Sequence, residues 1–173
     1  MLELCFTRRF SMGHRLIGGQ SERCALPHGH NEFVTATLQP VRPARLDGVS
    51  NMLVPFEQAK ARWHCFVDER LDHALQLSDT DPLLAWFRAN EPGRAERIVV
   101  TPGDPTTELM ACLLMAKLSA ILLAEGGLLR VAEIRIEETP TNTVAFSGDP
   151  SEMLPQFGPG TEGWWQRADM SIA

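Results

Sequence analysis

Strand-like segments lie at the two ends of the chain, and segments of helical periodicity lie between them. Alternating apolar residues indicate four strands, at residues 2–10, 31–40, 128–138 and 141–148. The last two are joined through Pro140 and predict a hairpin. Strands grouped at the ends with helices between them indicate an α+β fold, in which helices cover one face of an antiparallel sheet. The expected order of elements is ββααββ.

The two expected helices differ in how they meet the core. The first begins at Phe56 and has apolar residues at helical spacing with charged residues between them, which predicts an amphipathic helix. The second, residues 109–124, is apolar almost throughout and follows a capping segment at 101–108. It spans 16 residues and contains Lys117, so it is too short and too interrupted for a membrane span. We therefore expect a buried helix and no membrane partner.

Composition narrows the class of protein. The chain has 173 residues, 44% of them hydrophobic, which suits one compact domain with a sizeable core. Its net charge is −6 and it has no cluster of basic residues, so we expect no nucleic-acid partner. The N-terminus lacks the features of a signal peptide. The four cysteines have no CxxC spacing, which together with the N-terminus predicts reduced thiols in a cytoplasmic protein.

Residues 1–148 and 149–173 differ in character. The first range contains all the expected strands and helices, whereas the second is rich in proline and glycine and is expected to be irregular. Trp164 and Trp165 are too costly to leave in water. We therefore expect this C-terminal extension to pack on the body of the domain or on a neighbouring subunit.

Three histidines form a candidate metal site. His28 and His30 are two positions apart in an extended segment, so their side chains point to the same face of the sheet. His14, at the end of the preceding strand, comes close to them if the first two strands pair as an antiparallel hairpin. Three neutral histidines with an open fourth position are typical of a catalytic zinc site. A chance pair of surface histidines is the alternative, and the upstream histidine and the nearby Cys24 weigh against it.

Cys24 has two interpretations. As a fourth ligand it would close the metal site and make it structural. As a free thiol beside the metal it would act as an acid or base, because its neighbours set its pKa and only the thiolate is an effective base. Composition does not decide between them.

Two further positions carry candidate chemistry. His73 follows Asp72 just past the first helix, and is either an ordinary histidine at a helix C-terminus or the partner of a carboxylate that orients it for proton transfer. Glu138 ends the third expected strand. It is either solvated or accepts the two parallel N–H donors that a 2-amino-4-oxo pterin or a guanine ring presents.

These motifs occur together, and in order, in one known family. The chain resembles the 6-pyruvoyltetrahydropterin synthase / 6-carboxytetrahydropterin synthase family at five motifs: FSMGHRL (10–16), CALPHGH (24–30), LDHALQL (71–77), PTTE (105–108) and EETPT (137–141). The resemblance spans residues 1 to about 148. Five ordered motifs are far more specific than an HxH pair alone.

The resemblance implies a fold and a metal. The fold is the tunnelling fold, in which a four-stranded antiparallel sheet carries two helices on one face and the subunits assemble their sheets into a barrel. The implied metal is one zinc ion per subunit, bound by His14, His28 and His30. The implied assembly is a homo-oligomer, a trimer or hexamer, with active sites between subunits.

The resemblance also implies roles for residues outside the metal site. Cys24 resembles the catalytic thiol of the family, with Asp72 and His73 as a proton relay. Glu138 resembles the residue that anchors the pterin ring. The positions beside the ring are those of the PTTE motif, namely Thr106, Thr107 and Glu108.

The interval between Cys24 and His28 is three residues, similar to that in the bacterial 6-carboxy-forming enzymes of the queuosine pathway. The implied reaction converts 7,8-dihydroneopterin triphosphate to 6-carboxy-5,6,7,8-tetrahydropterin and releases acetaldehyde and triphosphate. The alternatives are formation of 6-pyruvoyltetrahydropterin from the same substrate and a non-catalytic pterin-binding paralogue. For the triphosphate, the candidate basic residues are Arg8, Arg9 and Arg15.

Three features depart from the family pattern. Pro55 replaces an aspartate before the first helix, the segment 78–97 is longer than in the compact bacterial enzymes, and the C-terminal extension is additional. These departures leave room for a paralogue with another pterin substrate or product.

Overall fold

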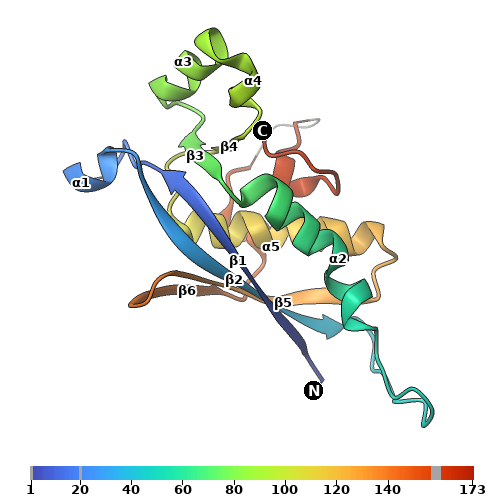
Figure 1. Cartoon of the computed structure of the whole chain (residues 1–173). Helices are drawn as coiled ribbons and strands as arrows, with labels where there is room; N and C mark the ends of the chain where they lie inside the picture. The colour runs from blue at the N-terminus through green and yellow to red at the C-terminus, as the bar shows by residue number, and fades with distance from the viewer. Residues whose placement is uncertain (1, 20, 157–160) are drawn as a thin grey trace.

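The computed structural model describes residues 2–19, 21–156 and 161–173. Its centre is a six-stranded sheet with the strand order β4-β3-β1-β2-β5-β6 (Figure 1). The strands are β1 (Leu4–His14), β2 (His28–Pro40), β3 (Ala74–Ser78), β4 (Ile98–Thr101), β5 (Leu129–Thr139) and β6 (Asn142–Phe146). The α-helices are α1 (Glu22–Ala25), α2 (Phe56–Phe66), α3 (Pro82–Asn90), α4 (Pro92–Ala95), α5 (Thr107–Ala124) and α6 (Pro150–Met153). A π-helical turn, η1 (Val67–Leu71), continues α2, and η2 (Trp164–Gln166) is a 3-10 turn.

The four expected strands form the antiparallel part of the sheet, in the α+β arrangement that the sequence predicts. β1 pairs with β2 over its full length, from Leu4 opposite Leu38 to His14 opposite His28. β2 pairs with β5, and β5 with β6 as the predicted hairpin.

The sheet has two strands more than the four expected. β3 lies parallel to the end of β1, and β4 lies parallel to β3. They are only five and four residues long, and runs of that length do not show a strand by their alternation alone. They form because the edge of β1 at Met12–His14 is open to the chain that leaves η1.

Alternation along the strands separates two faces of the sheet. The even-numbered residues of β1 and β2 share one face, since the two strands are paired in register, and most of them are buried. Ile134 and Ile136 of β5 are fully buried on the same face. The core lies here, between the sheet and the helices α2 and α5. The histidines of the candidate site are even-numbered, so they belong to this face.

The two long helices both pack in this core. α2 buries Ala59, Trp63 and Phe66, as its amphipathic pattern predicts. Pro55 precedes it and offers no side-chain cap, so this helix start has no capping oxygen. α5 is long and apolar enough to span a membrane by length and composition alone, but 61% of it is buried inside the protein. It is the core helix that the sequence predicts.

The segment between β3 and β4 is an insertion with its own small core. It contains two short helices, α3 and α4. The carboxylate of Asp81 caps α3 by accepting the backbone N–H of Leu83 at 2.7 Å. It also forms an ion pair with Arg15, just after β1, and its side chain is fully buried. The insertion is thereby attached near the end of β1 that carries His14.

The described part of the C-terminal extension packs on the same chain. Trp164 and Trp165 are buried, and the indole N–H of Trp164 donates to the carbonyl of Val100 in β4 at 2.7 Å. The ammonium group of the buried Lys117 donates to three backbone carbonyls of this segment, those of Trp164, Arg167 and Ser171, at 3.0, 2.8 and 3.3 Å. The extension therefore closes the core over α5.

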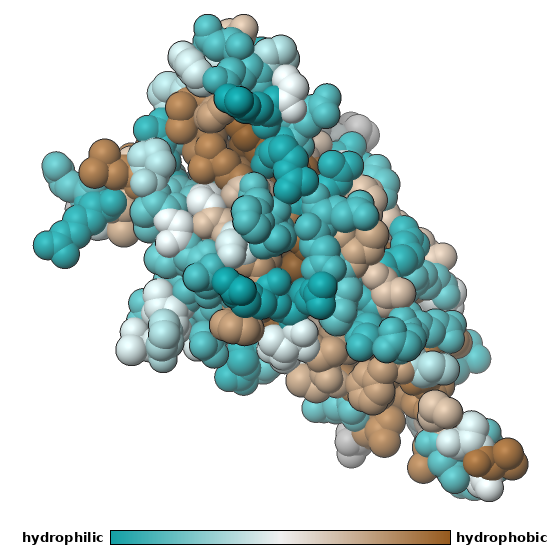
Figure 2. Space-filling model, viewed as in Figure 1, coloured by the Kyte–Doolittle hydropathy of each residue, from teal (hydrophilic) through white to brown (hydrophobic). Residues whose placement is uncertain are grey.

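A loop between β2 and α2 projects from the body (Figure 1). It exposes large apolar side chains, seen as brown patches at the lower right of the space-filling view (Figure 2): Leu46, Val49 and Met52. A cavity of about 570 Å³ lies at the base of this loop, lined by Leu2, Pro43 and Arg130 among others. It is at the end of the sheet opposite to the histidines, so it is separate from the candidate site.

Candidate active site

The three histidines lie together at one end of the sheet. His14 and His28 face each other in register, and their Nε2 atoms are 3.0 Å apart. The potential ligand atoms of His14, His28 and His30 lie within 4.8 Å of one another. Two ligands at 2.0–2.1 Å from a tetrahedral zinc ion are about 3.3 Å apart. Small side-chain adjustments would therefore let the triad hold one ion.

Backbone carbonyls fix the orientation of two of these rings. The Nδ1 atom of His14 lies 3.1 Å from the carbonyl oxygen of Pro105, and Nδ1 of His28 lies 2.9 Å from that of Leu26. A carbonyl can only accept, so each Nδ1 carries its hydrogen and each Nε2 keeps a free lone pair. Metal-binding histidines in proteins have this outer contact. The donor set therefore fits a zinc ion.

Burial of His14 and the close packing of β1 against β2 also favour metal binding by the three histidines. His14 is 2% exposed, and burial lowers its pKa, which favours the neutral form that binds metals. A Cβ atom at Gly29 would lie 2.6 Å from the backbone oxygen of Met12. Only glycine allows β1 to come this close, and this explains the glycine between the two histidines.

Cys24 is not part of the ligand cluster. Among the described residues, the group of histidine, cysteine and carboxylate ligand atoms at this site contains the three histidines alone. Cys24 lies on α1, is partly exposed as a free thiol, and its carbonyl oxygen accepts the N–H of Leu16 at 2.8 Å. This contact ties α1 to the end of β1. The geometry therefore favours the free thiol over the fourth ligand.

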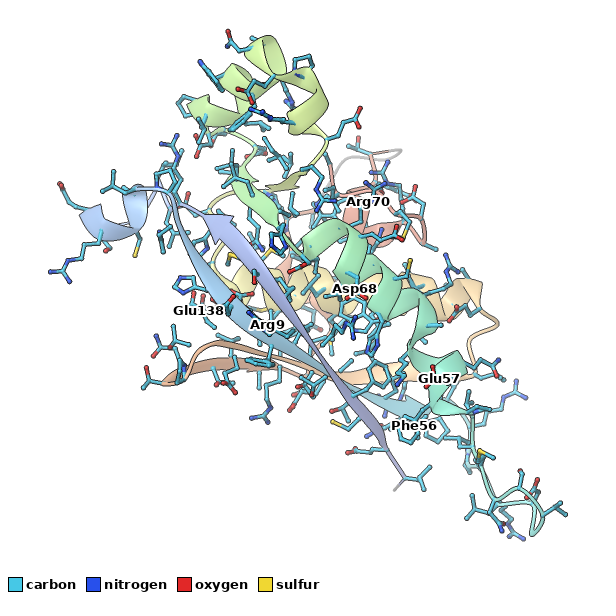
Figure 3. The ribbon with its side chains drawn as sticks, viewed as in Figure 1. Arg9, Phe56, Glu57, Asp68, Arg70 and Glu138 are labelled. Carbon is cyan, nitrogen blue, oxygen red and sulfur yellow. The ribbon has the colours of Figure 1, made fainter. Side chains whose placement is uncertain are left out.

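Glu138 lies near the end of β5, where its side chain meets the start of α5 (Figure 3). The hydroxyl of Thr107 donates to its carboxylate at 2.7 Å, and its negative charge acts on His14. Thr106 caps α5, since its hydroxyl accepts the N–H of Leu109 at 3.3 Å, and Glu108 is exposed on the first turn. Of the PTTE residues, Thr107 thus contacts Glu138, and Thr106 holds the helix start.

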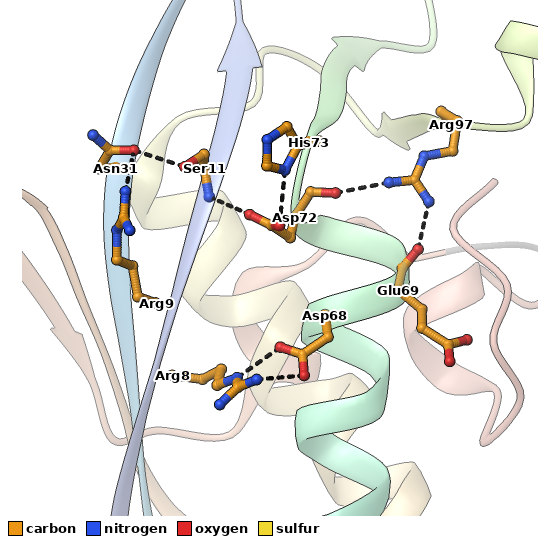
Figure 4. A network of polar contacts seen from close by, with 9 residues as sticks. All are labelled: Arg8, Arg9, Ser11, Asn31, Asp68, Glu69, Asp72, His73 and Arg97. Carbon is orange, nitrogen blue, oxygen red and sulfur yellow. Dashed lines mark hydrogen bonds and ion pairs between the residues drawn. The ribbon is translucent and has the colours of Figure 1, made fainter.

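Asp72 and His73 form the expected pair in a separate place, beside β1 (Figure 4). Nδ1 of His73 lies 2.8 Å from Asp72, whose other oxygen accepts the N–H of Ser11 at 2.7 Å. The contact with Ser11 is the main reason why the pKa of Asp72 is lowered. His73 has a φ of 59°, and its side chain is 78% exposed. A left-handed non-glycine residue is strained, which is common at functional positions.

The single chain brings together only part of the expected site. It joins the three histidines to Glu138 and Thr107. Among the described residues, no hydrogen bond or ion pair connects Cys24 or the pair Asp72–His73 to the triad.

The three arginines considered for the triphosphate all have partners. Arg15 forms its ion pair with the buried Asp81. Arg8 forms a bidentate contact with Asp68 at 2.6 Å, and Arg9 donates to Asn31 at 3.0 Å (Figure 4). Arg8 and Arg9 are on exposed surface, so water or a ligand can compete with their partners there.

Glu32 is a further residue beside the candidate site that the sequence motifs do not include. Glu32 follows His30 by two positions on β2, so it points to the same face, and it is 2% exposed. Burial and the nearby charge of Glu138 raise its pKa to about 8. The alternation that places His28 and His30 on one face of β2 also places Glu32 on that face, so the sequence contained this signal.

The sheet, its two covering helices and the histidine site at the sheet end define a tunnelling-fold protein with a candidate metal centre. The sequence profile of the 6-pyruvoyl tetrahydropterin synthase family matches residues 3–149, and the chain belongs to this family. Membership supports an activity of the tetrahydropterin synthase type.

Individual relatives agree with this assignment. The chain is 30% identical over 135 residues to a probable 6-carboxy-5,6,7,8-tetrahydropterin synthase of Halobacterium salinarum, with 78% of this chain and 79% of the relative covered. An uncharacterized protein from Wolinella succinogenes has a similar structure, with a TM-score of 0.66, 21% identity, and 84% of this chain and 97% of the other covered. The structure of the Caenorhabditis elegans 6-pyruvoyl tetrahydropterin synthase is also similar, with a TM-score of 0.57 and 20% identity. The match covers 85% of this chain and 95% of the other. The two structural matches show the fold.

Proposed function

We propose that the protein is a zinc-dependent lyase that converts 7,8-dihydroneopterin triphosphate and water to 6-carboxy-5,6,7,8-tetrahydropterin, acetaldehyde and triphosphate, a step toward queuosine and related 7-deazapurines. The observation that carries the proposal is the convergence of His14, His28 and His30 beside Glu138. A metal site next to an acceptor for the N–H donors of a pterin ring would suit this reaction. The name of the Halobacterium salinarum relative supports the 6-carboxy product.

Formation of 6-pyruvoyltetrahydropterin is the second candidate. The family profile and the Caenorhabditis elegans structure carry that name, and both reactions start from the same substrate. The interval of three residues between Cys24 and His28 favours the 6-carboxy reaction. Both candidates need the metal, the thiol and the ring anchor.

His14, His28 and His30 would hold the zinc ion, which when bound polarises substrate oxygens as a Lewis acid. Glu138 would accept the exocyclic amine and the ring N–H of the pterin, and Thr107 would hold that carboxylate in place. Thr106 and Glu108 would complete this side of the ring site. The ring would then present its carbon side chain toward the triad.

Cys24 would move protons on the carbon side chain of the substrate as a thiol and thiolate. The Asp72 carboxylate orients the imidazole of His73 through Nδ1, which leaves Nε2 of that ring for proton exchange. These groups lie apart from the triad in one chain, and the ring of His73 is open to solvent. We therefore propose a cytoplasmic homo-oligomer, a trimer or hexamer, in which a neighbouring subunit completes each active site.

Product analysis tests this function. The zinc-loaded protein is incubated with 7,8-dihydroneopterin triphosphate, and the products are identified by mass spectrometry. We expect 6-carboxytetrahydropterin and acetaldehyde from the wild type, none from Cys24→Ala, and unchanged products from the control Cys5→Ala, which alters an exposed thiol on β1. 6-Pyruvoyltetrahydropterin as the product would select the second candidate. If the wild type binds zinc and pterin but turns over no substrate, the protein is the non-catalytic paralogue.

A further inference from the structure

The carboxyl of Glu32 is placed beside that of Glu138. Glu32 is the register partner of Phe10 on one side. On the other side, the pairing of Phe33 with Glu137 and of Val34 with Ile136 brings Glu32 level with Glu138. Both side chains point to the helix-covered face, and the charge of Glu138 acts on Glu32. Two acidic side chains thus lie next to each other on adjacent antiparallel strands.

This arrangement of Glu32 and Glu138 lowers the stability of the folded protein when no ligand is bound. Like charges directly opposite each other destabilise a sheet, and a buried carboxyl without a hydrogen bond carries a desolvation penalty. Glu32 is 2% exposed, and no hydrogen bond or ion pair within the described residues satisfies its carboxyl. The buried charged groups Lys117 and Asp81, in contrast, have full sets of partners. Glu32 therefore lacks a structural role that would offset its cost.

A ligand rich in N–H donors would offset it. The 2-amino-4-oxo edge of a pterin has three N–H bonds, two on the exocyclic amine and one on the adjacent ring nitrogen. One carboxylate accepts two parallel N–H bonds, one from each nitrogen, and leaves the second N–H of the amine without an acceptor. A second carboxyl at the neighbouring strand position is suitably placed to accept it.

We propose that Glu32 is a second ring-binding residue, which accepts the amine N–H that Glu138 leaves free and makes the site selective for 2-amino rings. The inference rests on the proposed function, because it assumes that Glu138 anchors a pterin. A 2-oxo ring such as lumazine would place a carbonyl oxygen against Glu32 instead of a donor. Glu32 therefore sets specificity as well as affinity.

Binding of two unreactive rings tests the proposal. Dissociation constants of pterin and lumazine are measured by fluorescence titration on the zinc-loaded wild type, Glu32→Met and Glu32→Gln. Glu32→Met keeps the length of the side chain and removes the acceptor. We expect it to weaken pterin binding about ten- to a hundredfold and lumazine binding much less, so that the preference for pterin falls at least tenfold. Glu32→Gln retains one carbonyl acceptor, so its dissociation constant for pterin should lie between those of the wild type and Glu32→Met.

A melting temperature separates this role from a structural one. Because the carboxyl is unsatisfied in the ligand-free protein, Glu32→Met should melt at the same or a higher temperature than the wild type. Glu133→Gln is the matched control, an acid on β5 that pairs with Arg135 at 3.2 Å, and it should leave both the preference and the melting temperature unchanged.

The outcomes distinguish the two proposals. If the wild type forms the tetrahydropterin product but both Glu32 variants keep its preference for pterin, the role of Glu32 is refuted and the proposed function stands. A lower melting temperature with an unchanged preference likewise refutes it in favour of a structural role. If the wild type binds no pterin, both proposals fail.

Discussion

Gly29 shows how a single residue fixes the geometry of the metal site. It lies opposite Gly13 where β1 and β2 approach closely, and a Cβ atom there would meet the oxygen of Met12 at 2.6 Å. The rings of His28 and His30 on either side depend on this approach for their distance to His14. The sequence pattern HGH is thus a packing requirement as well as a ligand spacing.

The variant Gly29→Ala tests this requirement. Forcing the strands apart should lower the free energy of unfolding by about 1–3 kcal/mol, as overpacking usually does, and weaken zinc binding. Urea unfolding and metal analysis after dialysis measure the two effects. Gly93→Ala is the control, because a Cβ there meets nothing within 4 Å. A Gly29→Ala protein with wild-type stability and zinc content would contradict the close approach.

The histidines were predictable from the sequence, and Glu32 was not. The period of an extended strand places His28 and His30 on one face, and one hairpin brings His14 to them, so local rules were sufficient. Glu32 obeys the same period, but a glutamate in a strand gives no sign of burial by itself. Its significance depends on Glu138, more than a hundred positions later in the chain, and on the register that joins the two strands.

At the scale of elements, local pattern predicted the long segments and missed the short ones. The antiparallel strands and α2 show alternation or helical periodicity, and α5 is a long apolar run; each spans eleven or more residues, apart from the five-residue β6. β3 is defined by its pairing with β1, and β4 by its pairing with β3. To predict α3 from the sequence, Asp81 has to be recognised as its N-terminal cap. Asp81 is also the ion-pair partner of Arg15.

The docking of the C-terminal extension on α5 centres on a buried charge. The ammonium group of Lys117 is fully buried between three carbonyls, the ring of Phe66 at 4.9 Å and the carboxylate of Asp169 at 3.6 Å. Burial lowers the pKa of Lys117 to about 8, although Asp169 acts in the opposite direction. The free-energy cost of desolvating the ammonium group therefore exceeds the stabilisation that these contacts give to its charged form.

This depressed pKa predicts a pH dependence of stability. Below about pH 8 Lys117 is charged in both states and the folded state carries the full penalty. Between about pH 8 and the ordinary pKa of 10.5, the unfolded chain binds a proton that the folded chain does not, so stability rises with pH. The free energy of unfolding of the wild type, minus that of Lys117→Met, should increase across this range in urea titrations. Parallel profiles for the two proteins would contradict the assignment.

At the scale of the whole molecule, one chain carries the two groups of residues of the proposed active site in separate places. The triad, Glu138 and Thr107 lie on the helix-covered face, whereas the pair Asp72–His73 lies at the edge of β1, where it binds Ser11. The outer edge of β6 and most of that of β1 have no strand partner among the described residues. Open edges invite pairing with another copy, which suits the proposed homo-oligomer.

The central claim is that three imidazoles hold a metal whose remaining coordination is open to substrate. Zinc K-edge X-ray absorption of the zinc-loaded protein measures this directly, because sulfur and nitrogen ligands differ in distance and scattering. We predict only nitrogen and oxygen neighbours, at about 2.0–2.1 Å, with the oxygen contribution from exchangeable solvent. A sulfur shell at about 2.3 Å would show Cys24 closing the site as a fourth ligand, and would contradict the catalytic account.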